Sequence, residues 1–321
     1  MMETAVTGPA VTRDDIDAAA RRIAGYVRVT PVLELAPGEL GGDFVPLLKL
    51  EFLQHSGSFK ARGAFNNLLS RPVGPAGVTA VSGGNHGAGV AFAAARLGHR
   101  ARIYVPASAP PAKVALIRRL GADAVVGGTD ITQIFGACDA YAAETGALQV
   151  HPFGTPETIA GQGTMAREWQ QQSALDTVLI AVGGGGLISG AAAWLTGQGV
   201  RLVGVEPEGA RALHAALAAG APVDVVNTSI ASDSLGAPHV APLAFALCAR
   251  GVDHVALVTD ADIVLAQQTL WRDFRIATEP GGATAFAALQ SGAYRPGPGE
   301  RVGILMCGSN VDLLKLREIA G

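Results

Sequence analysis

The chain has 321 residues, of which 49% are hydrophobic and 16% charged, so it can bury a large core and does not belong to the disordered class. Its 24 Lys and Arg residues against 27 Asp and Glu residues give a net charge of -3, and this balance argues against nucleic acid as a partner. The three cysteines lie far apart, without zinc-ligand spacing or a disulfide framework, which favours a cytoplasmic protein.

The first predicted element is a helix over residues 12–27, because Thr12 can cap it and Asp14 and Asp15 stand in its first turn. Residues 1–10 contain no apolar stretch of the kind that a signal peptide needs. A short apolar stretch over residues 46–50 then leads into a segment that contains a lysine between small and aromatic residues.

From residue 77 the sequence alternates between short apolar runs and helical runs. The first series predicts strands over residues 78–82, 101–105, 124–126 and 148–151, with helices that end at residues 97, 120 and 144. The second series predicts strands over residues 177–182, 202–206, 254–258 and 302–307, helices over 187–195, 210–219, 262–274 and 283–289, and a loop over 221–238. Such alternation is typical of parallel α/β sheets. We therefore predict an α/β fold with two open parallel-sheet domains: a small α/β domain of residues 77–151 and a large domain of residues 1–76 and 152–321.

One apolar stretch needs a membrane test, because residues 177–200 carry no charge and are long enough to cross a bilayer. Its middle is a run of four glycines, residues 183–186, which would interrupt a spanning helix. A buried parallel strand followed by a helix gives the same apolar run. We favour this second interpretation and expect no membrane partner.

Ligands of open α/β sheets bind at the carboxyl ends of the strands, in a cleft. The four glycines 183–186 stand at such a place, between a strand and a helix, where backbone N–H groups and the helix dipole can hold a phosphate. They match neither the Walker spacing nor a dinucleotide-binding fingerprint with its acid. The alternative is a close contact between helix and sheet that requires small residues.

The segment Ser82-Gly83-Gly84-Asn85-His86 repeats the arrangement of strand, glycine turn and helix. Its amides and hydroxyl form a second anion cradle, of a size for a carboxylate. The alternative is an ordinary glycine turn in which Ser82 or Asn85 caps the helix.

Two single residues complete the set of candidates. Lys60 is either a solvated surface lysine or, beside Phe59 and a glycine-flanked turn, a desolvated amine that serves as a nucleophile or Schiff-base former. Cys307 ends the last strand and is either inert packing or a weak donor at the site. A phosphate cradle, a carboxylate cradle, a reactive amine and a thiol suit a phosphorylated aldehyde cofactor that acts on an amino acid.

Here the motifs resemble a family. The segments in order are Ser58-Phe59-Lys60-Ala61-Arg62-Gly63, Ser82-Gly83-Gly84-Asn85-His86, Gly183–Gly186, Gly204-Val205-Glu206-Pro207, Glu279-Pro280-Gly281-Gly282 and Cys307-Gly308-Ser309-Asn310. From about Asp15 to its C-terminus the chain resembles the fold-type II pyridoxal-phosphate enzymes of the tryptophan synthase β type, and most of all the serine/threonine dehydratases and serine racemases. The resemblance implies that the large domain binds pyridoxal 5'-phosphate in the cleft between the domains, and that the enzyme is a homodimer.

The resemblance also implies a role for each matching residue. It places the Schiff-base lysine at Lys60, the neighbour of the cofactor ring at Phe59, the partner of the ring hydroxyl at Asn85, the phosphate loop at Gly183, Gly184, Gly185, Gly186 and Leu187, a further cofactor contact at Glu279, and the partner of the pyridine nitrogen at Cys307. It places the contacts of a small amino-acid substrate at Ser82, Gly83, Gly84, Asn85, His86, His151, Phe153, Asp233 and Ser234.

The sequence departs from the family at two positions. Gly83 stands where serine racemases carry the acid/base of the opposite face, which disfavours racemisation. Glu206 and the Ala210 carbonyl match the family's metal site, but its Asp position is Ala212, which leaves a weak divalent site, a monovalent ion or no ion. The alternative for Glu206 is an acid at a strand end that neighbouring amides satisfy.

The predicted function is β-elimination from L-threonine or L-serine, which yields a 2-oxo acid and ammonia. Three alternatives remain open: a dehydratase of another β-hydroxy amino acid such as 3-hydroxyaspartate or phenylserine, a serine or other amino-acid racemase, and a catalytically silent binding protein. A dinucleotide-binding oxidoreductase is the alternative at the level of the fold, which the missing fingerprint weakens.

Overall fold

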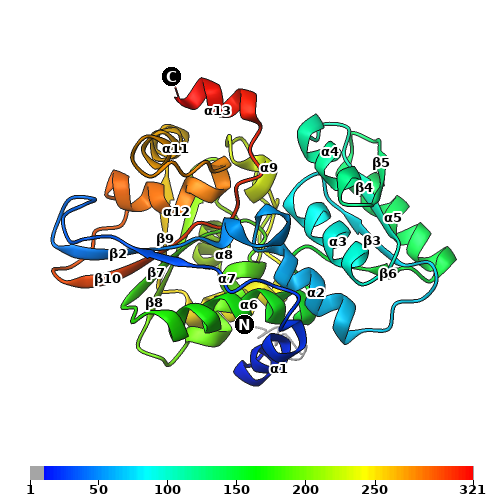
Figure 1. Cartoon of the computed structure of the whole chain (residues 1–321), viewed down its shortest axis with the longest axis horizontal. Helices are drawn as coiled ribbons and strands as arrows, with labels where there is room; N and C mark the ends of the chain where they lie inside the picture. The colour runs from blue at the N-terminus through cyan, green and yellow to red at the C-terminus, as the bar shows by residue number, and fades with distance from the viewer. Residues whose placement is uncertain (1–10, 321) are drawn as a thin grey trace.

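The strands of this protein form two sheets that lie side by side in the computed structural model, which describes residues 11–320 (Figure 1). The segment 1–10, for which the sequence predicts no signal peptide, lies outside the described residues. The six-stranded sheet has the order β1-β2-β10-β7-β8-β9, and the four-stranded sheet has the order β5-β4-β3-β6. All neighbouring strands run parallel except the edge strand β1, which pairs antiparallel with β2. The predicted α/β fold with open parallel sheets is confirmed.

The strands of the six-stranded sheet are β1 (Val32–Glu34), β2 (Phe44–Lys49), β7 (Thr177–Ala181), β8 (Arg201–Pro207), β9 (His254–Val258) and β10 (Glu300–Leu305). Helices α1 (Arg13–Ile23), α6 (Pro156–Gln172), α7 (Gly186–Leu195) and α10 (Pro242–Gly251) cover one face, and α11 (Asp260–Phe274) and α12 (Pro280–Ser291) cover the other (Figure 1). The remaining elements on this side are the 3-10 turns η1 (Glu51–Leu53) and η2 (His55–Gly57) and the helices α8 (Ala212–Ala219), α9 (Ser232–Leu235) and α13 (Leu313–Ala320).

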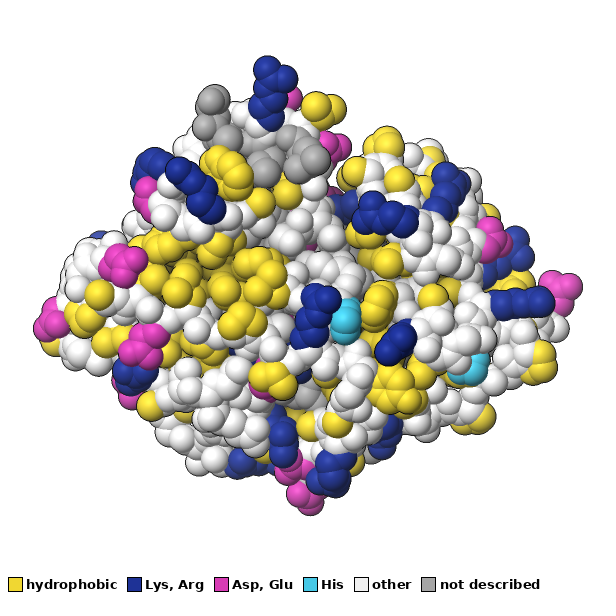
Figure 2. Space-filling model, in the orientation of Figure 1, with side chains coloured by type: hydrophobic (Ala, Val, Ile, Leu, Met, Phe, Trp, Pro, Cys, Tyr) yellow, Lys and Arg dark blue, Asp and Glu magenta, His cyan; other side chains and the backbone are white. Residues whose placement is uncertain are grey.

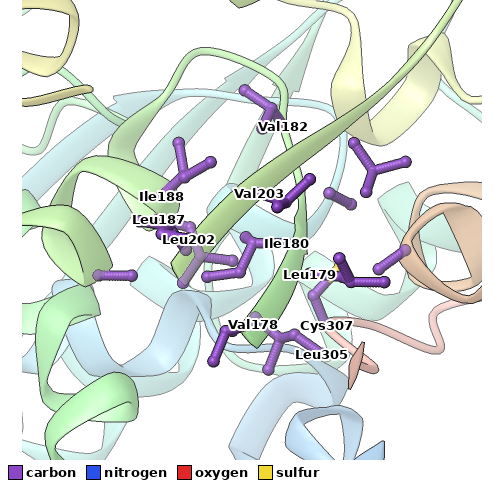
Figure 3. Packing of buried hydrophobic residues seen from close by; sticks show 14 of the residues in the cluster. Val178, Leu179, Ile180, Val182, Leu187, Ile188, Leu202, Val203, Leu305 and Cys307 are labelled. Carbon is purple, nitrogen blue, oxygen red and sulfur yellow. The ribbon is translucent and has the colours of Figure 1, made fainter. Parts of the chain in front are cut away.

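The central strand β7 is buried along its whole length, because helices cover both faces of the sheet. Figure 3 shows how side chains of β7 and β8 meet those of the following helix α7, among them Ile180, Val203 and Ile188. The apolar run over residues 177–200 is therefore a strand and a helix of the core. Within residues 11–320 no helix combines the length and the apolar character that crossing a bilayer requires.

The four-stranded sheet contains β3 (Val78–Val81), β4 (Ala101–Val105), β5 (Asp123–Val126) and β6 (Leu148–Gln149), with helices α3 (Asn85–Arg96), α4 (Pro111–Arg119) and α5 (Ile131–Thr145). Helix α2 (Lys60–Ser70) packs on both α3 and α6, so it joins this sheet to the larger one. Its residues Ala61 and Phe65 share a hydrophobic cluster with strands β3 and β4. A domain boundary at residue 77 stays a prediction, since the core under this sheet also uses residues before it.

Helix α6 is the longest element that the sequence did not predict. The sequence did not indicate a helix here because the segment contains glycines, which are normally unfavourable in a helix interior. Here they allow close helix packing: a Cβ at Gly161 would lie 2.7 Å from the Cα of Gly63 on α2, and a Cβ at Gly163 would lie 2.9 Å from the carbonyl of Gly190 on α7. Helix α1, in contrast, begins where its Thr12 cap predicted and ends at Ile23, earlier than expected.

Hydrophobic side chains gather over the six-stranded sheet on the face that Figure 2 shows, whereas Lys and Arg side chains on this face lie singly or in pairs. Apolar residues near the edge strand are exposed, such as Val29 at 75% and Leu53 at 41%. The homodimer that the resemblance implies stays a prediction.

Candidate active site

A cavity lies where the two sheets meet, at the carboxyl ends of β7 and β10. Its walls come from the helix starts of α2, α3, α7 and α12 and from the short helix α9. The lining residues are Phe59, Lys60, Asn85, Phe153, Ala181, Val182, Gly183, Gly184, Gly185, Gly186, Leu187, Ile188, Ser234, Leu235, Glu279 and Cys307. All predicted cofactor residues are in this set, and of the predicted substrate residues Asn85, Phe153 and Ser234 are.

The glycine loop 183–186 forms one wall, between β7 and α7. Gly185 has a φ of 87°, which favours glycine, and it precedes α7 as a cap residue without a side chain. In the part of the chain that the structure describes, no side chain caps the N-terminus of α7. Its first N–H groups therefore have no partner within the helix and can hold an anion.

The loop 151–154 packs against these glycines. A Cβ at Gly184 would collide with the ring of Phe153, and a Cβ at Gly186 would lie 2.7 Å from the Cα of Phe153. The Nδ1 atom of His151 accepts hydrogen bonds from the amides of Phe153 (3.3 Å) and Gly154 (2.8 Å), so the proton of the neutral ring is on Nε2. Burial lowers the pKa of His151 to about 4. The close contact that requires small residues is therefore present at the glycine loop, and its role in binding a phosphate stays a prediction.

Lys60 is the first residue of α2, and its side chain extends into the cavity. Its Nζ donates to the carbonyl of Pro152 at 2.8 Å and lies 5.1 Å from the centre of the Phe59 ring. Burial lowers its pKa to about 8, because desolvation disfavours the ammonium form. About a tenth of the amine is therefore unprotonated at pH 7, far more than for a solvated lysine, and the unprotonated form is what a nucleophile or a proton acceptor requires.

Cys307 follows β10 and lines the same cavity. Its Sγ lies 3.4 Å from the carbonyl of Gly281, and burial raises the pKa of the thiol to about 12. The thiol stays neutral, so it offers a weak hydrogen bond and no charge to a group in the cavity.

Asn85, at the start of α3, is held in place by two residues on the side of the six-stranded sheet, Asn310 after β10 and Glu279 before α12. Its Oδ1 accepts from the amide of Asn310 at 2.7 Å, and its Nδ2 donates to Glu279. Glu279 precedes α12 and is 1% exposed. Asn310 also donates to the carbonyl of Ser56, in the turn that leads to Lys60. These bonds connect the two sheets directly at the cavity.

The turn with Ser82, Gly83 and Gly84 lies beside the cavity rather than in its wall. The Ser82 hydroxyl accepts from the amide of Gly84 at 3.1 Å, a bond within the turn. The N-cap of α3 is Gly84, and in the described part of the chain neither Ser82 nor Asn85 caps the helix with its side chain. His86 Nε2 lies 2.9 Å from the Val150 carbonyl, and burial lowers the pKa of this imidazole to about 3. His86 is thus a neutral group that joins α3 to the end of β6.

The sequence did not single out Lys113, a residue of α4 that reaches the edge of the site. Its Nζ lies 2.9 Å from Glu279 and 2.9 Å from Asp233, one of the predicted substrate residues. One local signal existed: the lysine stands in the first turn of a helix, where the macrodipole disfavours a cation.

Glu206, the predicted metal ligand, is buried at the end of β8. Its two oxygens accept from the amides of Leu213 and His214, both at 2.8 Å, and burial raises its pKa to about 7. This is the alternative in which neighbouring amides satisfy the acid. Across residues 11–320 the structure holds no group of three or more His, Cys, Asp or Glu residues arranged for a metal ion. A cation at Glu206 and Ala210 stays a prediction.

The residues around the cavity fit the cofactor that the resemblance implies. The uncapped start of α7 suits its phosphate, the amine of Lys60 suits its aldehyde, and the neutral thiol of Cys307 suits an uncharged ring nitrogen.

Comparison with known proteins agrees with this geometry. Residues 23–308 match the family model described as pyridoxal-phosphate-dependent enzyme. The phenylserine dehydratase of Ralstonia pickettii is 42% identical, covering 91% of this chain and 90% of its own. The biosynthetic L-threonine dehydratase of Mycobacterium tuberculosis is 38% identical, covering 95% of this chain and 73% of its own. The structure of maize serine racemase superposes with a TM-score of 0.89 at 33% identity and covers 97% of each chain. The chain belongs to the family of pyridoxal-phosphate-dependent enzymes, with the fold-type II architecture of its dehydratases and racemases.

Proposed function

We propose that this protein removes the β-hydroxyl group from a β-hydroxy-α-amino acid, with L-threonine and L-serine as substrates, and so releases a 2-oxo acid and ammonia. The single observation that carries the proposal is the buried amine of Lys60, whose lowered pKa of about 8 makes it a proton acceptor in a cavity with an anion cradle. The likeness to an L-threonine dehydratase supports the choice of substrate.

Bound pyridoxal phosphate supplies the electron sink for the pair of electrons that a departing α-proton leaves behind. Lys60 holds and moves that proton, because its Nζ is unprotonated in part near neutral pH and lies inside the cavity. The amides at the start of α7 would hold the phosphate, and Asn85 at the start of α3 would orient the ring. The neutral thiol of Cys307 would place a weak hydrogen-bonding group and no charge beside the ring nitrogen.

Phenylserine is the second candidate substrate, because the phenylserine dehydratase relative is 42% identical over nearly the whole chain. A racemase is disfavoured by Gly83, since glycine carries no group that could return a proton to the opposite face. A silent binding protein would have no need for a buried, partly neutral lysine at this place.

A substrate panel tests the proposal. We expect the loaded protein to form a 2-oxo acid and ammonia from L-threonine and L-serine, and Lys60→Ala to abolish both products and the borohydride-fixed cofactor. Phenylserine and D-serine complete the panel, and the chirality of the remaining substrate is followed separately. A much higher kcat/KM for phenylserine moves the assignment to the second candidate. Release of the enantiomer without 2-oxo acid refutes a dehydratase in favour of a racemase.

A further inference from the structure

Lys113 extends from α4, beside the four-stranded sheet, to two carboxylates on the side of the six-stranded sheet. Its side chain is 6% exposed, and its Nζ lies 2.9 Å from Glu279 Oε2 and 2.9 Å from Asp233 Oδ2. No role is assigned to it by the proposed mechanism. We call these three residues, Lys113, Asp233 and Glu279, the bridging cluster.

Glu279 connects the bridging cluster to the cavity. One of its oxygens accepts from Lys113, and the other accepts from Asn85, so both donors come from the side of the four-stranded sheet. Asn85 lines the cavity that fits the cofactor. The position of the Asn85 amide therefore depends on a carboxylate whose own position depends on Lys113.

Asp233 connects the bridging cluster to the opposite wall. It belongs to α9, whose next two residues, Ser234 and Leu235, line the cavity. Its backbone carbonyl lies close to the glycine turn at the start of α3, since a Cβ at Gly84 would be 3.1 Å from this oxygen. The same lysine thus contacts α9 through Asp233 and the start of α12 through Glu279.

The charges explain why this contact is strong. Two carboxylates and one ammonium are held together with little exposure, and the two carboxylates raise the pKa of Lys113 against the effect of burial. Without the lysine, Glu279 would stay buried at 1% exposure without its cation, which is costly. Separation of the two sheets, which brings water to the carboxylates, would relieve that cost.

We propose that Lys113 is a positioning residue: it holds the four-stranded sheet against α9 and the start of α12, and through Glu279 it orients Asn85 toward the cofactor. The proposal rests on the proposed function for the meaning of the site, but the contact itself is independent of the substrate. Loss of Lys113 shifts the protein toward an arrangement in which the two sheets are apart. If the closed arrangement falls to a tenth of the molecules, the apparent affinity for substrate falls about tenfold.

The test compares Lys113→Met with Lys315→Met, a lysine-to-methionine change at an exposed residue of α13 that lines a neighbouring cavity with Lys113. We expect Lys113→Met to keep one borohydride-fixed cofactor per chain and to raise the KM about tenfold or more, with a smaller change in kcat. Amide hydrogen exchange should become faster in residues 82–88 and 231–236, in the protein with and without cofactor. Lys113→Arg, which keeps the charge, should recover most of the KM and of the protection from exchange.

Two results overturn the proposal: exchange and KM in Lys113→Met that equal those of Lys315→Met, or a Lys113→Arg variant no better than Lys113→Met. Circular dichroism and unfolding curves exclude a general loss of the fold. Failure of the proposed function is distinguishable, because a wild-type protein that converts no β-hydroxy amino acid but shows faster exchange in Lys113→Met refutes the function and supports the role of Lys113.

Discussion

Two clusters of buried charge differ in the balance of their charges and in the elements that contribute them. The balanced cluster consists of Lys49, Glu51, Arg62 and Glu168, two cations with two anions, and its members lie on β2, η1, α2 and α6. The bridging cluster of Lys113, Asp233 and Glu279 has one cation for two anions, and its members come from both sheets.

The balanced cluster is connected at every charge. Arg62 Nη2 lies 3.0 Å from Glu51 and 2.9 Å from Glu168, while Lys49 Nζ lies 2.6 Å from Glu168 and 2.8 Å from the carbonyl of Thr30. Arg62 stands two residues after Lys60 on α2, so this cluster fixes the helix that carries the reactive amine. The difference indicates different roles: the balanced cluster fixes the helix that carries Lys60, and the bridging cluster, with one cation for two anions, holds α4 against α9 and the start of α12.

The largest expected effect is on stability, from Arg62→Met in the balanced cluster. It leaves Glu51 buried without its cation, and removal of one partner of a buried pair costs about 3–5 kcal/mol of unfolding free energy. Denaturant unfolding of the wild type and variant measures this loss.

Lys113→Met is the matched variant in the same assay. We expect it to lose less stability than Arg62→Met, because Asp233 is already 28% exposed and water can reach it when the sheets separate. Equal losses of unfolding free energy would contradict the distinction between the balanced cluster and the bridging cluster.

The next effect is the pH dependence of cofactor uptake, which is set by the amine of Lys60. The folded state lowers the pKa of Lys60 to about 8 from 10.5, so the ammonium form is disfavoured in the fold. The cofactor aldehyde reacts with the free amine, so the rate at which the cofactor-free protein takes up pyridoxal phosphate should rise about tenfold per pH unit below 8 and level off above it. Absorbance between about pH 6.5 and 9.5 follows this uptake.

The lowered pKa of Lys60 also makes the free energy of unfolding depend on pH. The destabilising contribution of Lys60 to the cofactor-free protein is fully present below about pH 8 and decreases as the pH rises from there toward the unfolded value of 10.5. In the wild-type protein the midpoint of cofactor uptake should lie near 8, because burial lowers the pKa of Lys60. A midpoint near 10 would show a solvated amine and contradict the site.

The smallest expected effect is on product chirality, from a change at Gly83. This residue lies in the turn before α3, which the bridging cluster holds against α9. Gly83→Ser supplies a hydroxyl where the resemblance places the opposite-face acid, but its Cβ would lie 2.5 Å from the Cβ of Ala109. We therefore expect the double variant Gly83→Ser/Ala109→Gly to release more of the opposite enantiomer than either single variant. Chiral chromatography of the remaining serine measures it, with Ala109→Gly as the control. Unchanged chirality would show that Gly83 does not occupy that face.

The sequence predicted those parts of the site that are local in the chain. Each of the segments at Gly183–Gly186, Ser82–His86 and Cys307 follows a strand, and the carboxyl ends of parallel strands meet at one edge. His151 was expected on the substrate side, but its Nδ1 accepts two amides of its own loop. Local hydrogen bonds of that kind depend on backbone angles that no residue pattern displays.

The sequence by itself determined the alternation of strands and helices, the glycine turns, and Lys60 as the candidate for the amine. Only the tertiary structure decided that Lys113 joins Glu279, which is 166 residues away in the chain, and that Glu206 is satisfied by amides. The physical reason is that apolar periodicity and turn preferences act between neighbours in sequence, whereas the partner of a buried charge depends on which surfaces the packed core brings together.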